Sequence, residues 1–276
     1  MTTATWLLSA LTLLAQAKDA PSTPGQRIDL GGEATLFVPE GYRPSNGEVD
    51  VVLHLHGASS VVEPALVAQE GPAVLIEFNR KGLSSVYTAP FSDRTLFPRL
   101  LDRAIQSLKE RGIVPEPKLG RVTVSSFSAG FGGVRELLKV PEHVARIDTL
   151  IMADSLYAGY EGDPADRVVD PKLMADFRAF AILAASGEKT MVLTHSSQVP
   201  QGYASTTETA DDLLRAVEGV AKTDRVDRGG GWVQTRSFRR GNLTILGFEG
   251  AGPEDHMRHL RRIADLWKVA WGEPVS

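Results

Sequence analysis

The stretch RVTVSSFSAGFGGVREL, residues 121–137, decides how the rest of the sequence is interpreted. Its apolar run at residues 122–124 is typical of a β-strand, and a helical pattern follows within a few residues. Between them stands Ser128, two residues after Ser126 and two residues before Gly130. Small residues are needed at these spacings where a strand turns sharply into a helix, because larger side chains would collide with neighbouring backbone. The pattern predicts that Ser128 lies on such a turn.

Three serines, Ser125, Ser126 and Ser128, compete for the position of a nucleophile on this turn. Ser128 alone has small residues on both sides at the crowded spacing, so we predict that it is the nucleophile. The alternative is a glycine-rich turn that has no chemistry or that binds phosphate. A dinucleotide-binding fingerprint would need glycine in place of Arg135, and no P-loop lysine follows.

Composition favours one large α/β domain over residues 27–276. The chain has 276 residues, of which 42% are hydrophobic, enough to bury a sizeable core. The formal net charge is -4 and no block of like charge occurs, so neither nucleic acid nor an anionic membrane surface is an expected partner. The composition does not predict an oligomeric state.

The first residues differ from the rest. A short apolar run at residues 6–14 precedes Ala15-Gln16-Ala17, a small-x-small cleavage pattern. We therefore predict a signal peptide at residues 1–17, a flexible leader at 18–26, and a secreted or periplasmic protein without a transmembrane span. The absence of cysteine is compatible with an oxidising compartment. The alternative is a partly buried N-terminal helix.

Strand and helix patterns alternate along the chain, which predicts a mostly parallel sheet with helices on both faces. A capping box from Ser205 to Glu208 opens a helix that is expected to run to about residue 221. The other expected helices span residues 95–111, 132–139, 171–186 and 255–271. The expected strands span residues 34–38, 49–56, 73–78, 122–124, 149–153, 190–194, 232–238 and 243–248. In such sheets ligands bind at the carboxyl ends of the strands.

Histidines follow two of these strands. His256 stands after the last strand, at the start of the last helix, where it can serve as general base for Ser128. His259 is one helical turn further along and is expected to pack or to lie at the surface. His195 follows the strand at 190–194 and is expected to line the pocket without acting as base.

An acid must orient the base, and Asp154 is the predicted one. It directly follows the strand at 149–153 and lies between Ser128 and His256 in chain order. The alternatives are three acids of the helix that begins near residue 206: Glu208, which the capping box already occupies, and Asp211 and Asp212, which suit a first helical turn.

With these residues assigned, the chain resembles the α/β-hydrolase superfamily over roughly residues 31–271. The resemblance rests on His56-Gly57, residues 126–130, Asp154 and His256, in that order. It implies the α/β-hydrolase fold, with an eight-stranded, mostly parallel sheet, and an acyl-enzyme route. The sequence departs from the family at Ser126, where glycine is usual, and in placing the acid one strand earlier than is common.

The resemblance also implies an oxyanion hole. One backbone amide would come from Ala129, and the other from the turn at Ala58 and Ser59. A metal site is the alternative, because His54-x-His56 is similar to the start of a metallo-β-lactamase ligand set. That set needs aspartate and histidine where this chain has Ala58 and Ser59. His54 is instead expected to be a hydrogen-bonded strand residue.

The predicted function is that of a serine hydrolase which cleaves a carboxylic ester without a metal or an organic cofactor. Its substrate would be a small-molecule or carbohydrate ester. Walls of the pocket are expected from residues 155–169 and 196–204, with substrate contacts from Phe127, Tyr157, Tyr160, His195 and Tyr203. Two alternatives stay open: a non-catalytic binding protein on the same fold, and an acyltransferase that uses the same triad.

Overall fold

The structure is a computed structural model that describes residues 22–69, 71 and 73–272. The described chain forms two compact units, one ending at Asp148 and one beginning at Thr149, and each is described by itself. The signal peptide predicted for residues 1–17 lies outside the described residues. Within them, no helix is both long and apolar enough to cross a membrane.

Among the described residues of the first unit, five strands form a mixed sheet. Their order is β1 (Gly25–Gly31), β2 (Ala34–Pro39), β4 (Ala73–Phe78), β3 (Glu48–Leu55) and β5 (Lys118–Phe127). The strand β3 pairs in parallel with both β4 and β5, whereas β1 and β2 add antiparallel strands at one edge. Every residue of β4 is buried, including Glu77, as expected for a strand that is covered on both faces.

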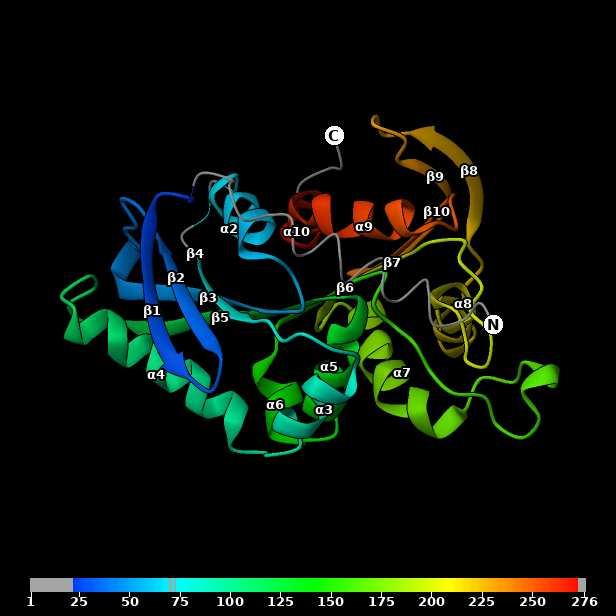
Figure 1. The fold of residues 1–276 in the computed structure, drawn as a ribbon, viewed down its shortest axis with the longest axis horizontal. Coiled ribbons are helices and arrows are strands. Elements are labelled where there is room, and N and C mark those ends of the chain that lie inside the picture. The colour runs from blue at the N-terminus through cyan, green and yellow to red at the C-terminus, as the bar shows by residue number, and fades with distance from the viewer. Residues whose placement is uncertain (1–21, 70, 72, 273–276) are drawn as a thin grey trace. The chain divides into compact units, whose positions relative to one another are not determined.

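Helices cover both faces of this first sheet. In Figure 1, α2 (Ser59–Val67) lies on one side of the strands and α4 (Leu96–Glu110) on the other. The buried side chains of α4 recur at helical spacing, which explains why the sequence predicted this helix closely. The other helices among the described residues of this unit are α3 (Ser85–Phe91), α5 (Phe131–Leu138) and α6 (Pro141–Arg146), with short 3-10 turns at η2 (Ser45–Gly47) and η3 (Ser128–Gly130).

The second unit holds another five strands among its described residues. Their order is β6 (Thr149–Ala153), β7 (Thr190–His195), β10 (Leu243–Phe248), β9 (Val233–Arg240) and β8 (Lys222–Asp227). The strand β7 pairs in parallel with β6 and with β10, so the carboxyl ends of these three strands lie at one edge. The strands β9 and β8 continue the sheet as an antiparallel hairpin.

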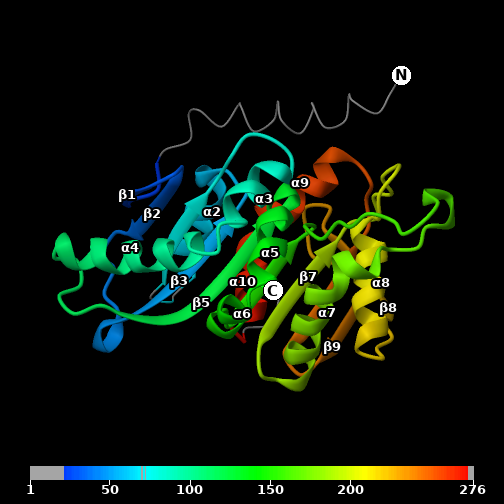
Figure 2. The same ribbon diagram turned by 90° about the horizontal axis from the view of Figure 1, so that it is seen from below.

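Helices α7 (Pro171–Ser186) and α8 (Thr206–Ala216) lie along the same side of the second sheet, as Figure 2 shows. The helices α9 (Pro253–Arg261) and α10 (Ile263–Ala270) lie on its other side (Figure 1). The 3-10 turn η4 (Pro164–Asp166) interrupts the long connection from β6 to α7. The predicted class, an α/β protein with parallel central strands and helices on both faces, is confirmed for each unit.

Several predicted boundaries were wrong for physical reasons. The strand expected at 122–124 extends to Phe127, because Ser125 and Ser126 still pair with β3. The helix expected to reach residue 221 ends at Ala216, since Glu218 has a left-handed φ of 50°. The last helix is broken at Arg262 into α9 and α10. The strands β1 and β8 and the helices α2, α3 and α6 were not predicted.

Candidate functional site

Ser128 lies where β5 ends and the single turn η3 leads into α5. Its φ of 47° is in the left-handed region, where a residue with a side chain is strained, and such strain clusters at functional sites. A Cβ added to Gly130 would lie 2.4 Å from the backbone oxygen of Leu55, which explains the glycine. The predicted tight turn between strand and helix is present and carries Ser128.

The turn after β3 is organised by His56. This residue has a left-handed φ of 67°, and its Nδ1 lies 2.7 Å from the hydroxyl of Tyr87. Its ring stacks on the buried Phe127, with centroids 5.9 Å apart. Ala58 then caps α2, and Ser59 is the first residue of that helix. The two residues predicted to supply oxyanion-binding amides therefore lie at a helix N-terminus, which favours negative charge.

His54 is a buried strand residue, as expected. Its Nδ1 lies 3.0 Å from the hydroxyl of Ser125 on β5. Burial, with the nearby His56, lowers the pKa of His54 to about 3, so the imidazole is neutral at physiological pH. Within the part of the chain that the structure describes, no three His, Cys, Asp or Glu side chains are grouped to hold a metal ion.

Glu77 places a carboxyl group against the first turn of α2. It lies on β4, is 6% exposed, and accepts a hydrogen bond from the hydroxyl of Ser59. The neighbouring Glu63 of α2 is paired with Arg27. Burial, opposed by the Ser59 hydroxyl and reinforced by the Glu63 charge, raises the pKa of Glu77 to about 7. This carboxyl changes its charge near neutral pH.

We expect the substitution Glu77→Gln to remove a pH dependence of stability. A carboxyl with a raised pKa in the folded chain favours folding when protonated, so its contribution is complete below pH 4.5 and is lost as the pH rises through about 7. The loss should be roughly 3 kcal/mol in the free energy of unfolding. Urea denaturation at about pH 5 and about pH 8 measures it, and the wild type should lose more stability than the variant. Equal losses would contradict this account.

In the second unit, Asp154 and His256 form a hydrogen-bonded pair. Asp154 directly follows β6, has a left-handed φ of 45° and is fully buried. Its Oδ2 lies 2.7 Å from Nδ1 of His256, in the first turns of α9. Because a carboxylate only accepts hydrogen bonds, Nδ1 donates and the lone pair of the ring is on Nε2. This is the tautomer that a general base needs.

The other carboxylate oxygen of Asp154 is also saturated. Its Oδ1 accepts hydrogen bonds from the backbone N–H of Ser196, at 2.9 Å, and from the hydroxyl of Thr206, at 2.5 Å. Burial alone would raise the pKa of Asp154, but the imidazoles of His259 and His256 and the Thr206 hydroxyl hold it well below its usual range. The carboxyl is therefore ionised at neutral pH.

The three rival acids have other partners. Glu208 closes the capping box on Ser205 and accepts from Tyr160 and Arg167. Asp212 is paired with Arg178 and Arg215, and Asp211 with Arg236. Asp154 is the acid that is hydrogen-bonded to His256. This is the contact that the hypothesis of an orienting acid requires.

His195 is enclosed by its own partners. Arg236 donates to its Nε2 at 2.7 Å, so Nδ1 carries the proton and faces Thr207 and the backbone oxygen of Ser196. Burial and the Arg236 charge lower the pKa of His195 to about 3. With 4% of its surface exposed, this neutral ring offers little area to a substrate.

The three tyrosines expected at the pocket lie in two groups. Tyr157 and Tyr203 make an edge-to-face pair with centroids 5.7 Å apart, and Tyr203 is 39% exposed. Burial, with the nearby charge of Asp154, raises the pKa of Tyr157 well above its ordinary value. Tyr160 instead donates to Glu208 and lies under the guanidinium of Arg167. Substrate contact by any of them stays a prediction.

Comparison with known proteins gives likenesses in structure only. No family model matches the chain, and no curated protein does. A structure described as FAE is 13% identical over 92% of this chain and 91% of its own, with a TM-score of 0.50. A feruloyl esterase module from Clostridium thermocellum is 14% identical over the same shares, with a TM-score of 0.48. Dienelactone hydrolase from Anabaena variabilis is 10% identical over 88% of this chain and 95% of its own, with a TM-score of 0.39.

The likeness at a TM-score of 0.50 covers nearly all of both chains, and it shows the fold alone. The chain has the α/β-hydrolase fold. In enzymes with that fold, the nucleophile stands on a sharp turn from a strand into a helix, which is the kind of turn that carries Ser128 here. The predicted resemblance is thereby confirmed at the level of architecture.

Sequence reasoning missed the groups that surround Asp154. Thr206 and Ser196 both bond to Asp154, and neither was predicted to do so. His259 is 1% exposed, and its Nδ1 lies 2.8 Å from the hydroxyl of Thr194. The helical spacing of His256 and His259 was visible in the sequence, but nothing in it indicated that the second ring is packed beside the acid.

Proposed function

We propose that the chain is a serine hydrolase that cleaves a carboxylic ester through an acyl-enzyme intermediate. Ser128 is the nucleophile, His256 the general base and Asp154 the orienting acid. The proposal rests above all on one observation, the fully buried Asp154 carboxylate that accepts from Nδ1 of His256. A buried ionised acid is costly unless it is well bonded, and here it fixes the tautomer of a single imidazole.

The chemistry follows from that tautomer. Nε2 of His256 takes the proton from the Ser128 hydroxyl as its oxygen attacks the ester carbonyl, and Asp154 stabilises the imidazolium that forms. His256 then returns the proton to the leaving alcohol. Water attacks the acyl-enzyme, with His256 again as base, and releases the carboxylic acid and free Ser128.

The backbone amides of Ala129 and of the Ala58–Ser59 turn stabilise the oxyanion in this proposal. Two facts support these donors: Ala129 directly follows Ser128 in η3, and Ser59 begins α2. Amides at helix N-termini point outward with partial positive charge, as an oxyanion requires. Tyr157 and Tyr203 supply an aromatic contact surface for a small-molecule or carbohydrate ester, which an exported enzyme would meet outside the cytoplasm.

Labelling with a fluorophosphonate tests the proposal on the wild-type chain. This probe phosphonylates a serine only when a base activates it, so one equivalent should bind and the modified peptide should contain Ser128. The same chain unfolded in urea should not be labelled. A folded chain that takes up no label would instead favour a non-catalytic binding protein. A label on Ser125 or Ser126 would assign the nucleophile to that serine in place of Ser128.

A further inference from the structure

The first turn of α8 contacts the acid of the proposed triad. The hydroxyl of Thr206 donates to Oδ1 of Asp154 at 2.5 Å, and these two residues are 1% and 0% exposed. The backbone N–H of Ser196 supplies the second donor to the same oxygen. Oδ1 therefore has two fixed donors, and Oδ2 is left for His256. The direction in which the carboxylate presents Oδ2 depends on what holds Oδ1.

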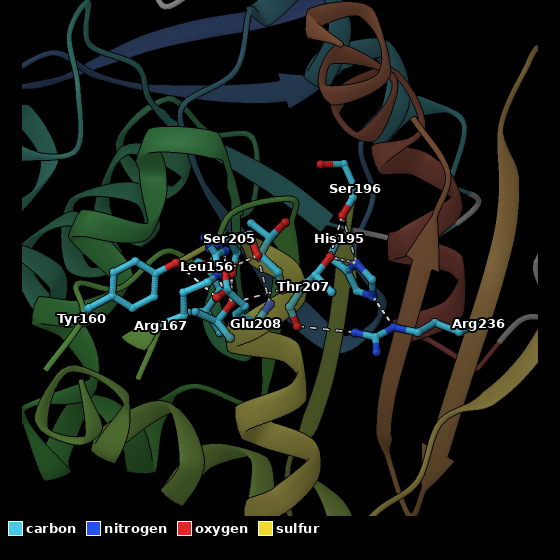
Figure 3. A network of polar contacts seen from close by, with 11 residues as sticks. Leu156, Tyr160, Arg167, His195, Ser196, Ser205, Thr207, Glu208 and Arg236 are labelled. Atoms are coloured by element: carbon cyan, nitrogen blue, oxygen red, sulfur yellow. Dashed lines mark hydrogen bonds and ion pairs between the residues drawn. The ribbon is translucent and has the colours of Figure 1, made fainter. Parts of the chain in front are cut away.

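One side of that helical turn is held by its capping box. The hydroxyl and the backbone N–H of Ser205 both bond to Glu208. Tyr160 and Arg167, from the connection between β6 and α7, donate to the same carboxylate, as Figure 3 shows. The connection is also tied to α8 by Thr209, whose hydroxyl donates to the backbone oxygen of Leu156 at 2.7 Å.

The other side is held through Thr207. Its hydroxyl donates to the backbone oxygen of Ser196 at 2.8 Å and lies 3.0 Å from Nδ1 of His195. Arg236 of β9 donates to the opposite nitrogen of that ring, as Figure 3 shows. The same guanidinium pairs with Asp211 of α8. Thr206 lies between these two anchored residues, so its backbone has little freedom. A β-branched side chain adds a stiff χ1, which aims the hydroxyl.

We propose that Thr206 is a positioning residue of this enzyme: its hydroxyl holds Oδ1 of Asp154 so that Oδ2 faces Nδ1 of His256. The inference rests on the proposed function for its catalytic consequence, and on the contacts of the second unit for its geometry. Thr206 touches neither substrate nor the reacting atoms in this role. It acts through the acid.

The substitution Thr206→Val keeps the shape of the side chain and removes the hydroxyl. We expect kcat/KM for p-nitrophenyl esters to fall about 10- to 100-fold, the effect of losing one hydrogen bond to a charged group. The loss should appear in kcat, with KM little changed. The hydroxyl acts through Asp154, which stabilises His256 when that ring becomes charged in the transition state and not when the substrate binds. Thr206→Ser restores the hydroxyl and should regain most of the rate.

The pH profile separates positioning from mere stability. Without the Thr206 hydroxyl, Asp154 has one donor fewer and a higher affinity for a proton, so the Asp154–His256 pair should take up its proton at higher pH. The acidic limb of kcat/KM should therefore move to higher pH. The other titratable groups that face the pair within the second unit are the same in the wild type and in Thr206→Val. They are His259, His195, Tyr157 and, beyond His259, Asp255.

Thr209→Val is the matched control. It removes an equally buried threonine hydroxyl from the same helix, one that bonds to Leu156 and not to the acid. We expect it to keep the wild-type pH profile and at least about a third of the rate, because only a neutral hydrogen bond is lost. Equal losses and equal profiles in the two valine variants would overturn the proposal, and so would full activity in Thr206→Val.

Nuclear magnetic resonance distinguishes failure of this inference from failure of the proposed function. The histidine ¹⁵N signals of the folded chain report protonation of His256 with no substrate present. In Thr206→Val, or in Thr206→Ala should the valine variant not fold, this titration should move to higher pH, and in Thr209→Val it should not. An unchanged titration overturns the positioning role even if the wild type is an active hydrolase. A shifted titration in a chain that fluorophosphonate does not label would support the positioning of Asp154 by Thr206 and would contradict the proposed serine hydrolase activity.

Discussion

Replacing Ser128 by alanine is expected to lower kcat/KM for p-nitrophenyl esters by a factor on the order of 10⁶, as when the nucleophile of a serine triad is removed. The left-handed φ of 47° at this position would be retained, because the turn is set by the neighbouring backbone and by the crowding at Gly130. Folding should therefore be intact. The steady-state rate of ester hydrolysis, with circular dichroism to confirm the fold, measures the effect.

Ser126→Ala is the control for this result. Ser126 is fully buried and lies two residues before Ser128, on the paired part of β5. Alanine is small enough for the crowded position, so we expect the rate to stay within about tenfold of the wild type. If Ser126→Ala abolished the rate and Ser128→Ala preserved it, the assignment of the nucleophile would be wrong.

Local chemistry explains why the turn at Ser128 and the position of Asp154 at a strand end could be predicted from the sequence. The turn at Ser128 requires small neighbours, and that requirement is visible within five residues. Asp154 follows an apolar run that is buried throughout β6, so its position at a strand end could be predicted from pattern alone. The capping box at Ser205 is a four-residue signal, and the structure contains it.

What the sequence could not predict depends on tertiary contact. Thr206 bonds to an acid 52 residues away, and a threonine in a first helical turn has no pattern that indicates such a partner. Helix α2 contains Pro64 and three valines, which lower helix propensity, so packing against β4 decides its structure. The break at Arg262 has a similar origin, since its guanidinium bonds to the backbone of Arg228 and Gly229.

Asp154→Asn is expected to lower kcat by about 10⁴-fold through the wrong tautomer of His256. Because Ser196 and Thr206 both donate to the Oδ1 position, the amide oxygen of the new asparagine must occupy it. The amide nitrogen then takes the place of Oδ2 and donates to Nδ1 of His256. The ring must carry its proton on Nε2, and it can no longer accept the proton of Ser128.

The fall in kcat expected for Asp154→Asn is larger than the loss of a negative charge alone would give. A rival acid, Asp212, provides the control. Asp212→Asn removes a charge of the same unit that is equally buried but paired with Arg178. Stability should fall there, while the rate of the folded fraction should stay within about tenfold, because the tautomer of His256 is untouched. Kinetics for both variants, with the ¹⁵N chemical shifts of His256 to identify its tautomer, measure the difference. A large loss in Asp212→Asn with wild-type kinetics in Asp154→Asn would assign the acid to α8. Wild-type Nδ1 protonation in Asp154→Asn would show that Thr206 and Ser196 do not fix the carboxylate as argued.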